Sequence, residues 1–189
     1  SEDANSFERN DTRKNIDGTE AGVYFSNRFR LLSPLAVEAG GRYDYTSWTE
    51  DKNFSPRVNT AYAVGKNTSI RAGWGKFYQT HYIHQLNIID NEVDFYPAEL
   101  SEHFVIGLEH EFKIGVNIRI EAFRKKLSAI RPHYMNYINT MDITPEISND
   151  RIMINPDQGG SKGIEIYAFR NYRGQHSWWL NHAYSIAEK

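Results

Sequence analysis

Apolar and polar side chains alternate with a period of two along most of this chain, a pattern typical of β-strands that show one apolar face. The alternation is clearest between Pro34 and Trp48. There Leu35, Val37, Ala39, Tyr43 and Tyr45 take the apolar positions, and Ala36, Glu38, Gly40, Arg42 and Asp44 lie between them. The pattern recurs near residues 20–30, 54–64, 69–75, 103–112, 114–122, 163–168 and 177–186, least regularly in the first and with His182 on the apolar side of the last. It therefore predicts an all-β chain of about eight strands in four hairpins.

The connections between these segments alternate in length. Tight turns are expected near Leu32, Lys66, Lys113 and Gly174, and longer links at residues 47–53, 79–99 and 128–161. Long unstructured loops are uncommon in a compact domain. They are typical of an outer-membrane barrel, which has short periplasmic turns and long extracellular loops. We therefore predict an antiparallel up-and-down sheet with short turns at one end and long loops at the other.

Two environments are compatible with such alternation, a membrane barrel and a soluble barrel or sandwich whose apolar side points inward. The membrane is favoured because most lysines lie in turns and because aromatic residues gather at the strand ends, as in an interfacial girdle. These aromatic residues are Tyr43, Tyr45, Trp74, Phe77, Tyr78, Trp178 and Trp179. A strand of about 11 residues rises ~36 Å, which a ~40° tilt reduces to ~28 Å, close to the thickness of a hydrocarbon layer. We predict that the apolar face meets lipid and the charged face lines a watery bore.

Composition narrows the function further. The 189 residues are 40% hydrophobic and 14% aromatic, too rich in apolar groups for a disordered chain. Lys and Arg number 22 against 24 Asp and Glu, without a long basic stripe, so we expect no nucleic-acid partner. The chain has no cysteine, which excludes disulfides and thiolate metal sites. No stretch approaches the ~20 apolar residues of a transmembrane helix, so a membrane-spanning form must use strands.

Several phrases resemble the barrel of TonB-dependent receptors, and their order and spacing are more specific than any one of them. They are Gly41–Tyr45 (GRYDY), Ser55–Arg57 (SPR), Arg71–Gln79 (RAGWGKFYQ), Glu99–His110 (ELSEHFVIGLEH), Arg119–Lys126 (RIEAFRKK) and Gly160–Ile166 (GSKGIEI). The resemblance covers most of the chain from about Ala21 onward.

The resemblance implies an outer-membrane receptor whose barrel of about twenty-two strands is filled by an N-terminal plug. Such a receptor imports a scarce nutrient, such as a metal chelate, a vitamin or a glycan, with energy from an inner-membrane protein. It is not an enzyme and needs no cofactor of its own. The chain shows neither a plug sequence nor a terminal aromatic residue, so we expect it to be the later part of a barrel. On this interpretation residues 1–19 are a polar leader left from an extracellular loop, and residues 20–189 are barrel wall.

The link at residues 79–99 holds the first candidate site residues, His81, Tyr82 and His84. Imidazoles three positions apart can share a metal ion on a helical turn. No further ligand stands at a convincing spacing, so surface polar residues are the better interpretation and we predict no metal. Instead, we expect this loop to contact an extracellular ligand.

The link at residues 128–161 carries the remaining candidates, Arg131, His133, Tyr134 and Tyr137. Aromatic and cationic groups together suit an anionic or sugar-like ligand. An ordered loop that packs on itself explains the same residues equally well. Both interpretations stay open at the level of sequence.

Catalytic signals are weak. There is no Gly-x-Ser-x-Gly elbow, phosphate-binding glycine loop or zinc motif. A hydrolase could be built locally only from Ser177 or Ser185 with His176 or His182. Inward carboxylates such as Glu38 and Glu121 need no catalytic explanation, because they balance the inward arginines that line the same bore. The alternatives to a receptor are therefore a soluble ligand-binding β-barrel and a barrel hydrolase.

Overall fold

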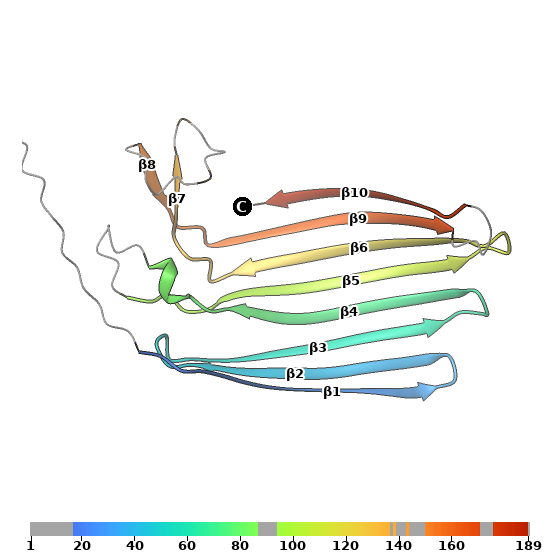
Figure 1. Cartoon of the computed structure of the whole chain (residues 1–189), viewed down its shortest axis with the longest axis horizontal. Helices are drawn as coiled ribbons and strands as arrows, with labels where there is room; N and C mark the ends of the chain where they lie inside the picture. Colours follow the sequence, from blue (N-terminus) through green and yellow to red (C-terminus); the bar gives the residue numbers. More distant parts are fainter. Residues whose placement is uncertain are drawn as a thin grey trace, which may run out of the picture.

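The computed structural model describes residues 17–86, 94–136, 138, 143, 150–170 and 176–188. Their main element is one eight-stranded antiparallel sheet (Figure 1). In order across the sheet, its strands are β1 (Glu20–Leu32), β2 (Leu35–Thr46), β3 (Asp51–Ala63), β4 (Thr68–Gln79), β5 (Glu99–Glu111), β6 (Val116–Ser128), β9 (Gln158–Arg170) and β10 (Trp178–Glu188). A small second sheet pairs β7 (His133–Asn136) with β8 (Arg151–Ile154), and the 3-10 helix η1 spans Ile83–Gln85. The predicted up-and-down sheet of about eight strands is confirmed.

The two ends of the sheet differ as expected. The tight turns after β1, β3 and β5 lie at one end, and η1 with the β7–β8 hairpin lies at the other (Figure 1). Two predicted links were wrong in detail. The link at residues 47–53 is only a turn over residues 47–50, made possible by a positive φ of 57° at Glu50. The link at residues 128–161 contains β7 and β8, whose short hairpin has too little periodicity to be recognised.

Register gives the sheet two chemically distinct faces. Each strand pairs with the next in an unbroken antiparallel register, apart from an irregularity between Arg30 and Leu32. Because opposed residues point to the same side, one row of partners can be followed across the sheet. That row is Leu35, Tyr62, Ile70, Leu108, Ile120, Ile166 and His182. The apolar positions therefore form one continuous face, on which His182 is the polar exception.

The apolar face is not covered within the described part of the chain. Leu86 and Ala98, in the loop-end connection, are the only hydrophobic residues there that are buried. Ile120 and Ile166, in the middle of the sheet, remain 42% and 41% exposed. A soluble sandwich would pack a second layer on this face. The described residues supply no such layer, which argues against the soluble alternative.

The apolar face is a slanted band. On β2 it runs from Leu35 to Tyr45, and on β6 from Val116 to Ala122. The row that starts at Leu35 meets β6 at Ile120, four residues past Val116. Four residues at ~3.3 Å, set against four strand steps of ~4.8 Å, give a slant of about 35°. This is the tilt expected when strands cross a bilayer obliquely.

The opposite face is polar and its charges compensate one another. Arg28 lies 2.6 Å from its cross-strand partner Glu38, and Arg71 lies 2.8 Å from Glu109. Two same-strand pairs, Arg42 with Asp44 and Arg119 with Glu121, add to them. These pairs are exposed to water, which screens them, so they contribute little to stability. Their main effect is a polar surface with little net charge.

Candidate ligand-binding pocket

A pocket of about 570 Å³ opens at the loop end of the sheet. It is built from the β4–β5 connection, the start of β5, the β6–β7 connection, β7 and β8. Its lining residues are His81, His84, Gln85, Leu86, Tyr96, Glu99, Ile130, Arg131, Pro132, His133, Tyr134 and Met153. Segments up to 72 positions apart in the chain therefore share one site.

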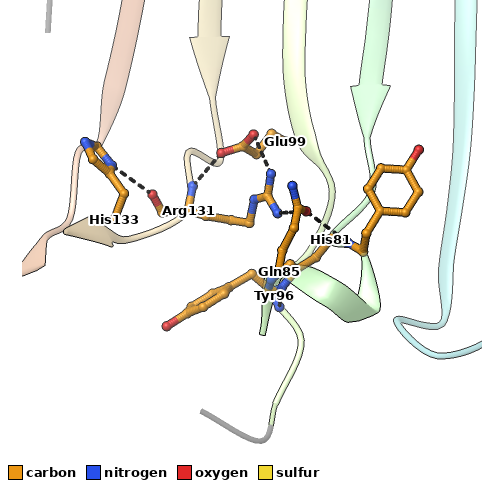
Figure 2. A network of polar contacts seen from close by, with 7 residues as sticks. His81, Gln85, Tyr96, Glu99, Arg131 and His133 are labelled. Atoms are coloured by element: carbon orange, nitrogen blue, oxygen red, sulfur yellow. Dashed lines mark hydrogen bonds and ion pairs between the residues drawn. The ribbon is translucent and has the colours of Figure 1, made fainter. Parts of the chain in front are cut away.

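Arg131 is the centre of the polar network in this pocket (Figure 2). Its Nη2 donates to Glu99 Oε2 at 3.1 Å, and its backbone N–H donates to Glu99 Oε1 at 2.9 Å. Its Nη1 donates to Gln85 Oε1 at 2.7 Å. The Arg131 side chain is only 13% exposed, so water screens these contacts less than it would at a surface pair. One side chain thus ties the β6–β7 connection to β5 and to η1.

A single turn of 3-10 helix presents the histidines. The Gln85 side chain accepts the backbone N–H of Tyr82 at 3.0 Å, which caps η1. His81 just before it is 3% exposed, and its Nδ1 accepts the backbone N–H of Tyr96 at 3.2 Å (Figure 2). The Trp48 indole N–H donates to the His81 carbonyl at 2.9 Å. His81 therefore anchors the loop more than it faces solvent.

The β6–β7 connection turns sharply over the pocket. Ala129 adopts a positive φ of 53°, in a region that costs a non-glycine residue about 1 to 2 kcal/mol. β6 ends just before this residue, and Ile130, Arg131 and Pro132, which follow it, line the pocket. Pro132 has no backbone N–H to continue a strand. The hydrogen bonds of Arg131 offset the cost.

The structure brings most of the predicted site residues together. His81, His84, Arg131, His133 and Tyr134 all line the pocket. A ligand-binding role for them stays a prediction. Tyr82 borders a neighbouring hollow instead and stacks on His84 with ring centroids 5.7 Å apart. Tyr137 lies outside the described residues, as do residues 1–16 of the predicted polar leader.

The lining residues missed at the level of sequence include three polar ones, Gln85, Tyr96 and Glu99. Glu99 begins β5, and the chain alone gives no sign that it meets Arg131, 32 positions away. Its presence changes the electrostatic expectation, because its carboxylate offsets the Arg131 charge. The pocket is consequently a nearly neutral set of hydrogen-bonding and aromatic groups, and a simple anion trap would need an unpaired cation.

Metal and hydrolase chemistry gain no support from this geometry. Among the described residues, no group of three or more His, Cys, Asp or Glu side chains is placed to hold a metal ion. His81 already uses Nδ1 to accept a hydrogen bond. His182 and Ser185 belong to opposite faces of β10, so that pairing cannot form.

These features define a class of protein: an outer-membrane β-barrel whose wall has a slanted apolar band outside, compensated charges inside and loops at one end. No helix among the described residues is long and apolar enough to cross a membrane. The family model "TonB dependent receptor-like, beta-barrel" matches residues 1–188. The chain belongs to this family, and its location in the outer membrane follows.

Solved structures agree with this assignment. The siderophore receptor PirA from Pseudomonas aeruginosa is similar at 18% identity and a TM-score of 0.70, over 91% of this chain and 35% of that one. The siderophore receptor PirA from Acinetobacter baumannii is similar at 15% identity and a TM-score of 0.68, over 91% of this chain and 28% of that one. The alcaligin outer-membrane receptor FauA from Bordetella pertussis is similar at 14% identity and a TM-score of 0.64, over 90% of this chain and 30% of that one. No curated protein sequence matches the chain. These identities show the fold alone, and the chain spans about a third of the length of these receptors.

Proposed function

We propose that this chain is part of the wall of a receptor that imports a metal chelate of the siderophore type, and that the pocket around Arg131 contacts the chelate. The family consists of transporters, and the similar structures include proteins named as siderophore receptors. The proposal includes a plug domain, further barrel strands and an inner-membrane partner that supplies energy. Vitamins and glycans are the competing substrate classes.

The observation that carries the proposal is the composition of the pocket. Aromatic rings and imidazoles surround a cavity whose volume suits a small molecule. Tyr134 lines it from β7, and the Arg151 guanidinium lies 5.1 Å from the Tyr134 ring centroid. Such cation–π pairing holds the ring in place. A flat, polar-edged chelate can stack on these rings and accept hydrogen bonds from the imidazoles.

The position of the pocket agrees with a first contact during import. It lies at the end that carries η1 and the β7–β8 hairpin, away from the tight turns (Figure 1). Glu99 belongs to the polar face of β5, so the pocket continues into the charged surface of the bore. A ligand bound there would have a polar path inward.

The test is uptake by the whole receptor in iron-limited cells. Tyr134→Ala removes a lining ring without breaking the Arg131 network, and we expect about tenfold weaker binding of a supplied ferric chelate, as loss of one aromatic contact implies. Lys66→Ala, in the β3–β4 turn at the opposite end, is the matched control and should bind as the parent does. Arg131→Lys tests positioning, because lysine keeps the charge but lacks the fork that reaches both Glu99 and Gln85.

Growth on a panel of ferric chelates, vitamin B12 and oligosaccharides separates the substrate classes. Growth rescued by a ferric chelate and lowered by Tyr134→Ala supports the proposal. Rescue by only a vitamin or a glycan contradicts the proposed substrate while leaving the pocket intact. Unchanged chelate binding in Tyr134→Ala contradicts the proposed role of the pocket.

A further inference from the structure

The outward face of β6 and β9 changes from apolar to basic near the loop end of the sheet. On β6 the apolar run ends at Ala122, and the next outward residues are Arg124 and Lys126. On β9, Lys162 follows Ile164 in the same direction and lies opposite Arg124 in the register. We call Arg124, Lys126 and Lys162 the basic cluster. Each shares its side of the sheet with Ile120 and Ile166, so the basic cluster adjoins the band that meets lipid.

Nearby acidic residues offset this charge only in part. Lys162 pairs with Glu188 at 2.7 Å, and Lys126 opposes Glu102 across the β5–β6 register. Glu102 also accepts the Trp74 indole N–H at 2.8 Å and faces Lys76 on β4. On these two outward rows, four cations thus meet two carboxylates. The surplus of two positive charges stands where the apolar band ends.

A hollow of about 520 Å³ opens among these side chains. Its lining includes the basic cluster, Gln158, Gly160 and Glu188. The basic cluster, Gln158, Gly160 and Glu188 lie on the outward side, since each alternates in step with Ile164 or its cross-strand partners, whereas Lys125, Gly159 and Ser161 line the hollow from the inward side. Gly160 stands between Lys126 and Glu188 in one row. A Cβ at Gly160 would lie 2.8 Å from the Lys125 carbonyl oxygen, so glycine is required there and leaves a gap in the row.

We propose that this hollow binds a lipid of the outer leaflet whose head group carries a phosphate monoester, with the acyl chains lying on the band beside Ala122 and Ile164. A phosphate monoester carries about 1.5 to 2 negative charges at pH 7, which matches the surplus of the two rows, whereas a phosphodiester carries one. Arg124 can bind two phosphate oxygens at once, and Lys126 and Lys162 act as point charges.

The position of the hollow selects a lipid over a soluble anion. The basic cluster in its lining lies on the outside of the barrel wall, next to the apolar band, so the molecule that reaches these cations most readily is already in the membrane. The loop end of such barrels faces the exterior, which makes the outer leaflet the source. Charge complementarity and the continuous apolar band thus point to the same occupant.

The experiment uses the full-length receptor in lipid nanodiscs and measures bound lipid by native mass spectrometry. The probes are diphosphoryl lipid A, its dephosphorylated form, phosphatidylglycerol and inorganic phosphate. The test variant replaces Arg124, Lys126 and Lys162 with glutamine. Since each basic residue near an anionic surface contributes roughly fivefold to affinity, we expect the three changes together to weaken lipid A binding on the order of a hundredfold.

Lys52→Gln is the matched control, because it removes the same charge from the outward side of β3, opposite Tyr45, and Lys52 does not line the hollow. It should bind lipid A as the parent does. In the parent receptor, removal of both phosphates from lipid A should cause a loss similar to that of the triple variant, a result that needs no variant to fold. If phosphatidylglycerol, a phosphodiester, binds as tightly as lipid A, the proposed preference for a phosphate monoester is wrong. Equal loss in Lys52→Gln, or competition by millimolar inorganic phosphate alone, would overturn the lipid site.

Discussion

Replacing Ile120 with arginine should destabilise the barrel wall by about 2 to 4 kcal/mol, the cost of an arginine near the middle of the lipid-facing band. Ile120 lies within the apolar run Val116–Ala122 of β6, between Leu108 and Ile166 in its row. The guanidinium would have no acceptor among these neighbours. An arginine at position 120 lies four residues before Arg124, where the basic cluster begins, so its side chain is too short to place the guanidinium among the lipid head groups.

Asn117→Arg is the control, because Asn117 lies on the polar face of the same strand and opposite Glu111. An arginine there enters the charged bore surface and should change stability by less than about 1 kcal/mol. The assay is urea unfolding of the receptor refolded in vesicles, followed by tryptophan fluorescence and by the mobility shift of folded barrels on gels. If the two arginine variants unfold at the same urea concentration, the apolar face does not meet lipid and the argument fails.

Two smaller predictions concern β9 and β10. Gly163→Ala should lower the free energy of unfolding by about 1 to 3 kcal/mol, and with it the unfolding temperature, because the new Cβ would lie 2.5 Å from the Tyr184 carbonyl oxygen and 2.8 Å from the Phe123 ring. Gly65→Ala, in an open turn, is the control, and equal losses in both variants would contradict the clash. His182→Leu should raise stability by about 1 kcal/mol, since it removes a polar ring from the lipid-facing row, and a lower unfolding temperature would show that the imidazole has a needed partner there.

The faces and the strand order could be predicted from the sequence because both depend on local spacing. Alternation at residues such as Leu35 and Val37 fixes which side each residue takes, and a slip by one residue would move Arg42 or Arg119 into lipid. Short turns then force neighbours along the chain to pair. The link at residues 47–53 was predicted too long because nothing local shows that Glu50 can take a left-handed conformation.

The pocket was only half predictable. Aromatic and cationic residues in loops such as Arg131 and Tyr134 are recognisable by type. Their partners are not, because Glu99 and Gln85 meet Arg131 only after two connections fold over the same end of the sheet. That meeting reversed the electrostatic expectation from a cationic site to a nearly neutral one.

The amino-acid sequence by itself determined which residues share the apolar face and which share the polar face of each strand, because an alternation of period two assigns successive residues to opposite sides. The aromatic strand ends and the lysines in turns then favoured lipid as the surroundings of the apolar face. The tertiary structure decided which residues of different strands and loops become neighbours. The slant of the apolar band, the Arg131 network and the basic cluster all depend on register between segments, and register is set by backbone hydrogen bonds that no single segment contains.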